Sequence, residues 1–235
     1  MRLHRRQREA EEIDDPALET ARLHGALHGL TTINLLSASA GILWPPLRRL
    51  ARRLKVRRLR VLDIASGAGD VPIRLWKKAR RAGLALDIHG LDISERALDF
   101  ARQRAAAAGA PLTFARHDAL SEKLPAGYDA IVSSLFLHHL DEQPAVRLLR
   151  AMAGATERLV LVNDLRRNLP GLWLAHFAGR CLTRSDVVRV DAVRSVRAAY
   201  TMAEARDLAA AAGLDGATLA RRWPCRFLLS WQRVK

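Results

Sequence analysis

The chain has 235 residues, of which 49% are hydrophobic, and it carries a formal net charge of +15. This length and composition suit one α/β domain with some additions, and the ordinary glycine and proline contents argue against long disordered tracts. Its two cysteines, Cys181 and Cys225, match no paired metal-ligand spacing and argue against a disulfide framework. We therefore expect a reducing, cytoplasmic setting.

The first 55 residues are expected to form an N-terminal helical lid. The basic residues 1–9 have no apolar region behind them, so they are not expected to be a secretory signal. Residues 33–47 are the most apolar segment, but it is interrupted and too short to span a bilayer. A first helix is expected to start at Asp14-Asp15-Pro16 and a second to cover residues 35–43, with Pro45-Pro46 ending it before a basic amphipathic helix.

Basic residues are densest from Arg48 to Arg60. This run fits a solvated helix face, an RNA-binding patch, or attraction to an anionic membrane surface that holds a lipid-like substrate. No aromatic residue interrupts the run, whereas surfaces that bind single-stranded nucleic acid usually need stacking side chains. We expect no stable nucleic-acid complex, and peripheral contact with a membrane surface stays open.

From residue 59 onward, predicted strands alternate with predicted helices. The strands are predicted over residues 59–64, 86–91, 112–115, 130–134 and 158–162, and the helices over 71–81, 95–108 and 143–153. A helix over 202–212 and a hairpin of 217–223 with 227–234 close the chain. This alternation implies a parallel sheet with right-handed crossovers in a domain of residues 56–235. The insertion 165–200 is expected to form one or two helices over the substrate pocket.

The first predicted strand runs into a turn of small residues, in which glycines allow a ligand to approach the backbone closely. A dinucleotide fingerprint would need a third glycine where Pro72 stands, and Asp70 would repel a pyrophosphate at the helix N-terminus. S-adenosylmethionine carries an adenosine, an ammonium group and a sulfonium, but no phosphate. The turn therefore favours this cofactor over NAD or FAD.

Two motifs carry a family resemblance. Asp63-x-x-x-Gly67-x-Gly69 resembles the first motif of class I S-adenosylmethionine-dependent methyltransferases, with Ala65 where that family usually has glycine. Leu137-His138-His139-Leu140, after the fourth strand, resembles the small-molecule branch, which includes enzymes that methylate quinone precursors. Amino-methyltransferases of nucleic acids usually have Asn/Asp-Pro-Pro-aromatic there, whereas this chain has residues Ser133 to Phe136 in that place. The resemblance implies a Rossmann-like, seven-stranded, mostly parallel sheet with helices on both faces.

Three carboxylates, Asp63, Asp92 and Asp118, fall at successive strand ends, which line one crevice in a parallel sheet. Asp92 follows Gly67 by about 25 residues, the spacing of a ribose-binding carboxylate. The resemblance implies that Asp118 bonds the adenine amino group and that Asp63 and Gly67 hold the methionine ammonium end. The predicted cofactor-binding residues are Asp63, Ala65, Gly67, Gly69, Asp92, Ile93, Asp118, Ala119 and Ser134.

Methyl transfer from a sulfonium is an in-line displacement in which the enzyme aligns the reactants and excludes water. A phenol or enol oxygen must also lose its proton to a base. His138 and His139 are the candidate bases. Asp164 and Arg166, after the fifth strand, and His176, in the insertion, are the candidate substrate-binding residues, and no metal site is expected.

These observations favour a methyltransferase that acts on oxygen or carbon of a small, largely apolar acceptor of phenolic, quinone-like or polyketide type. The alternatives are an RNA methyltransferase that uses the basic run 48–60 and a cofactor-binding protein without turnover. The sequence determines neither the acceptor nor the oligomeric state.

Overall fold

The computed structural model describes residues 3, 5–12, 17–19, 22, 25–26, 39–181 and 185–233. The helix start expected at Asp14-Asp15-Pro16 lies outside the described residues, and so do residues 35–38 of the second expected helix, 35–43. Among the helices in these ranges, none is both long and apolar enough to cross a bilayer.

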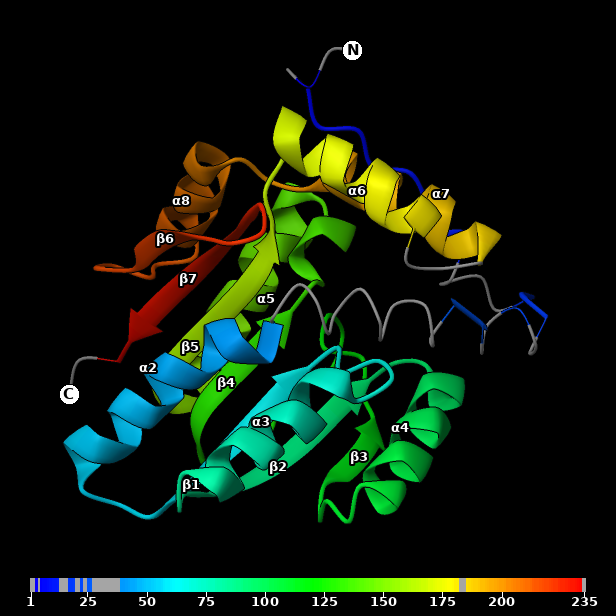
Figure 1. The fold of residues 1–235 in the computed structure, drawn as a ribbon. Coiled ribbons are helices and arrows are strands. Elements are labelled where there is room, and N and C mark those ends of the chain that lie inside the picture. The colour runs from blue at the N-terminus through cyan, green and yellow to red at the C-terminus, as the bar shows by residue number, and fades with distance from the viewer. Residues whose placement is uncertain are drawn as a thin grey trace.

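The centre of the molecule is a seven-stranded sheet with the strand order β3-β2-β1-β4-β5-β7-β6 (Figure 1). The strands are β1 (Arg58–Ile64), β2 (Ala85–Asp92), β3 (Thr113–Arg116), β4 (Tyr128–Ser134), β5 (Thr156–Leu165), β6 (Thr218–Arg222) and β7 (Arg226–Gln232). Strands β1 to β5 are parallel, and β7 pairs antiparallel with both β5 and β6. The predicted sheet, including its closing hairpin, is confirmed.

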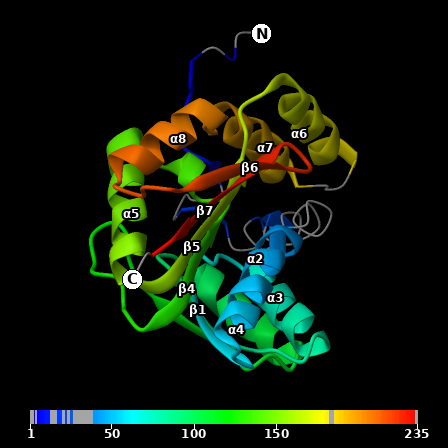
Figure 2. The same cartoon turned by 90° about the vertical axis from the view of Figure 1, so that its left-hand side faces the viewer.

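Helices cover both faces of the sheet (Figures 1 and 2). One face carries α2 (Ser39–Leu54), α3 (Asp70–Arg81) and α4 (Glu95–Ala107), and the other carries α5 (Glu142–Ala155) and α8 (Met202–Ala211). Because side chains alternate along a strand, β1 supplies both cores. Leu59 and Val61 pack on the α2–α3 side, and Leu62 and Ile64 pack on the α5–α8 side.

The break expected at Pro45-Pro46 is wrong, because both prolines lie inside the continuous helix α2. A proline removes one helix hydrogen bond and disfavours a helix interior. In α2 this loss is offset by a buried apolar stripe, in which Leu43 and Leu47 are fully buried in the core beneath the helix. The packing of this stripe decides the conformation, and the exposed ring of Pro45 faces solvent.

The insertion after β5 forms two helices, α6 (Leu169–Cys181) and α7 (Asp186–Ala198), as expected, and they lie beyond the carboxyl ends of the parallel strands (Figure 1). Residues 5–12 run along α7, with Gln7 N donating to Arg197 O at 3.1 Å. Arg6 also donates to the carbonyl oxygens of His138 (2.8 Å) and Leu140 (2.6 Å). The start of the chain is thereby attached to the turn that follows β4.

Candidate functional site

The turn between β1 and α3 is connected to the end of β2 through Asp92. Asp92 Oδ2 accepts a hydrogen bond from Gly67 N at 2.7 Å, and Oδ1 accepts one from Ser94 N at 2.9 Å. Gly67 has a φ of 51°, and a Cβ placed on it would meet no atom within 4 Å. The predicted pair of glycine turn and strand-end carboxylate is therefore brought together beside open space.

Gly69 has a different reason to be glycine from the one expected. A Cβ at Gly69 would lie 3.0 Å from Ala101 Cβ and 3.1 Å from the Phe114 ring. The close packing of α4 and β3 against the turn therefore favours a residue without a side chain at this position.

Gly90, in β2, is a second glycine beside the turn, and sequence reasoning missed it. A Cβ there would lie 2.6 Å from the Phe114 ring and 2.8 Å from Ser66 Oγ. An isolated glycine inside a predicted strand was the available signal.

Asp70 is paired within the protein, which weakens the argument that its charge excludes a phosphate. Its Oδ1 lies 2.7 Å from Arg104 Nη1, and the residue is 6% exposed. Asp63 is also buried, and burial raises its pKa well above the usual value, with the charges of Asp92 and Asp70 adding to the effect. A cationic ligand group beside Asp63 would offset this accumulation of buried negative charge.

Two buried polar atoms near the predicted cofactor site have no hydrogen-bond partner among the described residues: Ser66 Oγ in the turn and His117 Nε2 just after β3. Buried polar atoms are normally satisfied, so both suit hydrogen bonds to a bound ligand. They fit a ligand with hydroxyl and amino groups, as adenosine has.

The remaining predicted cofactor-binding residues differ in exposure and in their hydrogen-bond partners. Asp118 Oδ1 accepts from Leu120 N at 2.9 Å and Oδ2 accepts from Ser121 Oγ at 2.7 Å, so this carboxylate orders its own loop. Ser134 Oγ accepts from Asn163 Nδ2 at 2.8 Å. Ile93 is 60% exposed beside Asp92, whereas Ala119 and the turn residue Ala65 are partly buried. Their contacts with a cofactor stay predictions.

A buried histidine–aspartate pair lies at the same edge of the sheet. His138 belongs to the short helix η2 (Leu137–His139) after β4, and its Nδ1 is 2.6 Å from Asp164 Oδ1 near the end of β5. Asp164 also accepts from the backbone N–H of His138 at 3.2 Å and of Leu165 at 2.6 Å. Asp164 was predicted to bind substrate; its carboxylate faces His138, and contact with a substrate stays a prediction. The pairing fixes the imidazole and turns Nε2 away from Asp164.

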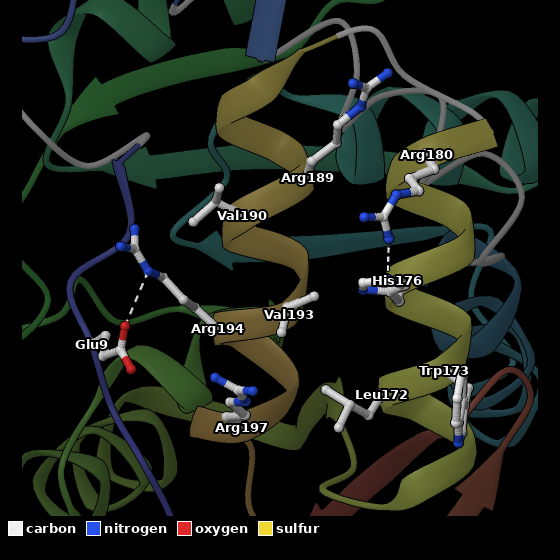
Figure 3. Close-up of a pocket in the computed structure, with 10 residues that line it drawn as sticks. All are labelled: Glu9, Leu172, Trp173, His176, Arg180, Arg189, Val190, Val193, Arg194 and Arg197. Carbon is white, nitrogen blue, oxygen red and sulfur yellow. Dashed lines mark hydrogen bonds and ion pairs between the residues drawn. The ribbon is translucent and has the colours of Figure 1, made fainter. Parts of the chain in front are cut away.

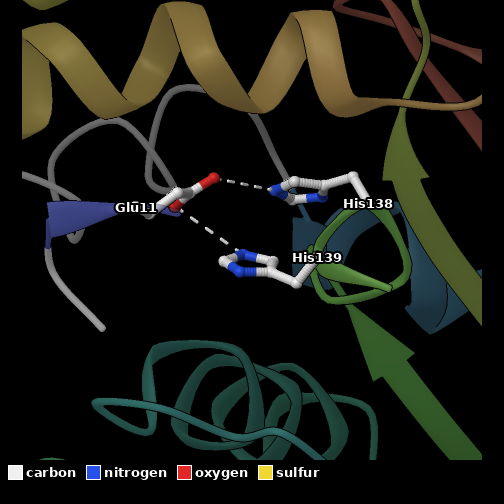
Figure 4. Close-up of side chains that lie close together, drawn as sticks. All are labelled: Glu11, His138 and His139. Carbon is white, nitrogen blue, oxygen red and sulfur yellow. Dashed lines mark ion pairs between the residues drawn. The ribbon is translucent and has the colours of Figure 1, made fainter. Parts of the chain in front are cut away.

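Glu11 faces the other side of this imidazole (Figure 4). Its Oε1 lies 3.5 Å from His138 Nε2 and its Oε2 lies 3.7 Å from His139 Nε2, while Ser195 Oγ donates to Oε1. Nothing in the sequence distinguished Glu11 from the other charged residues near the start of the chain. Sequence reasoning could not have found it, because its neighbours in space come from η2 and α7.

The electrostatics of this cluster follow from burial and from the charges that its members exert on one another. Burial lowers the pKa of His138, but Asp164 and Glu11 outweigh burial and raise that pKa to about 10. Burial raises the pKa of Glu11, but its bond to His138 and the charge of His139 lower it to about 2. Burial likewise raises the pKa of Asp164, and the His138 charge reverses the effect to leave it lowered. His138 is therefore an imidazolium between two carboxylates.

Glu11, His138 and His139 place three ligand atoms within 4.8 Å of one another, and nitrogen and oxygen donors of this kind bind zinc in other proteins. A cation here would have to replace the proton that the two carboxylates hold on His138. The cluster is satisfied as an ion-pair network, and the expected absence of a metal site stays a prediction.

His176 and Arg166 are the two other predicted substrate-binding residues. His176 lines a cavity of ≈ 690 Å³ between α6 and α7, where it is hydrogen-bonded to Arg180 (Figure 3). The residues that line this cavity include neither His138 nor Asp164, so the structure does not gather His176 with the other predicted substrate-binding residues. Arg166 is nearer to them in sequence, and its Nε is buried without a hydrogen-bond partner among the described residues.

The fold and the site together define a class of protein. A parallel sheet carries a glycine turn, a strand-end carboxylate bonded to that turn, and a buried histidine–aspartate pair at its carboxyl edge. Ligands of open α/β sheets bind at this edge. These features are typical of α/β enzyme domains that bind a nucleoside.

Comparisons with known proteins agree with this class. Residues 61–158 match the family model described as a methyltransferase domain. No curated protein sequence matches the chain. Among solved structures, the apo form of the S-adenosylmethionine-dependent methyltransferase SibL is 23% identical, with a TM-score of 0.65. The match covers 94% of this chain, which spans only 60% of the SibL chain.

Two further structures were solved with ligands. The plantazolicin methyltransferase BamL, in complex with a triazolic desmethylPZN analog and SAH, is 14% identical with a TM-score of 0.63, and the match covers 91% of this chain and 96% of BamL. An O-methyltransferase family 2 protein from Planctomyces limnophilus, in complex with apigenin, is 19% identical with a TM-score of 0.55. That match covers 75% of this chain and 50% of the other.

The comparisons agree with the resemblance read from the glycine turn and the strand-end carboxylates. Residues 61–158 match a methyltransferase domain, and the solved methyltransferase structures share the fold of this chain.

Proposed function

We propose that this methyltransferase transfers a methyl group from S-adenosylmethionine to oxygen or carbon of a small, largely apolar acceptor of phenolic, quinone-like or polyketide type. The observation that carries the proposal is the buried His138–Asp164 pair, 2.6 Å apart, at the sheet edge that also holds Gly67 and Asp92. The BamL and Planctomyces structures, each with a small organic molecule bound, support an acceptor of this size.

The cofactor is proposed to bind across the turn between β1 and α3. Asp92 would accept hydrogen bonds from the ribose hydroxyls while it keeps its bond to Gly67 N, since a carboxylate has lone pairs for both. Asp63 would face the cationic methionine end, and Ser66 Oγ and His117 Nε2 would gain partners. When bound there, S-adenosylmethionine supplies an electrophilic methyl group.

His138 is proposed to take the proton of the acceptor. Asp164 holds Nδ1, so Nε2 is the atom that can receive a proton from an acceptor hydroxyl. Glu11 occupies that side of the ring at 3.5 Å, so an acceptor must take the place of its carboxylate. Once Glu11 has moved away, one of the two charges that raise the pKa of His138 is lost, and that pKa falls toward neutral. The imidazolium would then release its Nε2 proton to solvent, and the neutral imidazole would take the proton of the acceptor hydroxyl. His139 is the alternative base.

The RNA methyltransferase alternative lacks support from the position of the basic run. Lys55 and Arg57 precede β1, and Arg58 begins it, whereas the site lies beyond the other end of that strand. A seven-residue strand is about 20 Å long. RNA bound along the run would therefore lie far from His138.

Two measurements test the proposal. Isothermal titration should detect S-adenosylmethionine binding that Asp92→Ala abolishes and that Asp207→Ala, a change at an exposed carboxylate on α8, preserves. Incubation of a cell extract with enzyme and methyl-labelled cofactor, followed by mass spectrometry, should reveal a small apolar product that gains one methyl group. Absence of cofactor binding by the wild type would refute the enzyme assignment, and label found only in RNA would refute the acceptor class.

A further inference from the structure

Helix α6 exposes a stripe of large apolar side chains. Leu169, Trp173 and Phe177 are 53%, 63% and 59% exposed, and they follow one another at four-residue intervals along one side of the helix. Leu174, 43% exposed, lies next to the stripe, and the rings of Trp173 and Phe177 stack with centroids 6.3 Å apart. Scattered exposed apolar residues need no explanation, but a contiguous aromatic stripe indicates an interaction surface.

The tip of the β6–β7 hairpin extends this surface. Trp223 at the tip is 77% exposed. The tip adjoins the start of α6, because a Cβ on Gly171 would lie 3.2 Å from Cys225 Cβ. Two exposed tryptophans and a phenylalanine therefore belong to neighbouring elements. Tryptophan is the residue most typical of the boundary between lipid headgroups and acyl chains.

The charges on α6 and on the β6–β7 hairpin have one sign. The sequence contains no aspartate or glutamate from Leu165 to Cys181, and none after Asp215. Arg180 at the end of α6 and Arg221 and Arg222 on the hairpin are all exposed. The apolar stripe is thus bordered by arginines without carboxylates on the same elements, which favours an anionic partner.

The cavity between α6 and α7 adjoins this stripe, because Trp173 is also one of its lining residues (Figure 3). Four arginines from the two helices line it, together with Leu172, Val190, Val193 and one carboxylate, Glu9; the arginines are Arg180, Arg189, Arg194 and Arg197. Glu9 pairs with Arg194 at 3.3 Å, so the lining keeps a positive excess. Its ≈ 690 Å³ is large enough for a headgroup phosphate with adjoining apolar atoms.

We propose that α6, the Trp223 turn and the arginine-lined cavity form a docking surface for a membrane that contains anionic phospholipid. The α6 stripe lies in the interfacial layer, and the cavity arginines receive a lipid phosphate. This docking is independent of the chemistry at His138, since none of its residues belongs to that cluster. It places on α6 the membrane contact that the sequence alone had left open for the basic run 48–60.

Vesicle flotation of the full chain tests the surface, with vesicles of phosphatidylcholine alone or of phosphatidylcholine and phosphatidylglycerol in equal parts. We expect binding to the anionic vesicles only. The pair of changes Trp173→Ser and Phe177→Ser should weaken it by about tenfold or more, because both exposed rings insert. The matched control is Val56→Ser with Leu120→Ser, which removes exposed apolar side chains elsewhere. Near-UV circular dichroism verifies that each variant is folded.

Charge variants distinguish the two basic regions. Arg180→Glu with Arg189→Glu should reduce binding to anionic vesicles, whereas Arg48→Glu with Arg49→Glu, at exposed positions on α2, should leave it within a factor of about two. Brominated acyl chains should quench wild-type fluorescence and should quench the Trp173→Ser variant less.

Three results would overturn the proposal. The first is no binding to anionic vesicles. The second is binding that survives the α6 changes and is lost with the α2 changes, which would assign the contact to the basic run. The third is a protein that does not bind vesicles but forms a dimer that Trp173→Ser dissociates. That result would assign the stripe to contact with a second copy of the chain.

Discussion

Replacing Asp164 by asparagine should destabilise the protein strongly, because the carboxylate is buried and its contacts admit no amide. Asp164 is 1% exposed and accepts from three N–H groups, His138 Nδ1, His138 N and Leu165 N. An asparagine would turn its NH₂ toward one of these donors. Breaking a buried ion pair by removing one partner costs about 3–5 kcal/mol.

The pKa of His138 gives a similar magnitude. The difference between the ordinary value of 6.5 and about 10 corresponds to about 5 kcal/mol, to which both carboxylates contribute. Because the folded-state pKa is the higher one, this stabilisation is fully present below about pH 6.5 and is lost as the pH rises toward about 10. The wild type should therefore lose stability across this interval, and Asp164→Asn should lose much less.

Calorimetry at several pH values measures both effects. For 235 residues the unfolding entropy is about 0.5 kcal/mol per degree, so a loss of 3–5 kcal/mol lowers Tm by about 6–10 °C near neutral pH. Asp207→Asn, at an exposed position on α8, is the control and should shift Tm by about 1 °C or less. The buried ion pair would be refuted if Asp164→Asn had the same Tm as the wild type at pH 7. It would also be refuted if the stability of the variant fell with rising pH as much as that of the wild type.

Three further predictions concern the turn, the sheet and metal dependence. Ala65 has a φ of 55°, so Ala65→Gly should relieve strain and raise stability by about 0.5–1 kcal/mol; a lower Tm would contradict this. Gly90→Ala would place a methyl group against Phe114 and Ser66, so it should lower the free energy of unfolding by about 1–3 kcal/mol and weaken cofactor binding. An unchanged Tm and an unchanged cofactor affinity in calorimetry would show that the sheet accommodates the methyl group. Dialysis against EDTA should leave the methylation rate within about twofold, because Glu11 already pairs with His138 and His139, and restoration of a lost rate by zinc would instead establish a metal site.

Much of the fold was readable because its signals are local. Buried strands in alternation with amphipathic helices predicted each strand of the sheet to within a few residues, and residues at the ends of parallel strands necessarily meet at one edge. For this reason Gly67 and Asp92 were correctly expected to be neighbours, and His138 was correctly placed at the same edge.

The errors arose where partners come from distant parts of the chain. Pro45-Pro46 predicts a helix end by local rules, but burial of Leu43 and Leu47 against the sheet keeps α2 intact. Asp70 looked like a free charge until Arg104 came within 2.7 Å. Local sequence carries no information about such contacts, because they exist only after the sheet has assembled.

By itself, the sequence determined the class of fold, the edge of the sheet that holds the candidate site, and the resemblance to methyltransferases, because periodicity and strand-end position are properties of short segments. The tertiary structure alone decided that Asp164 orients His138, that Glu11 closes the other side of the ring, and that α6 presents an aromatic stripe to solvent. Each of these depends on which surfaces meet or stay uncovered when the elements pack, and burial then sets the charge state of the groups involved.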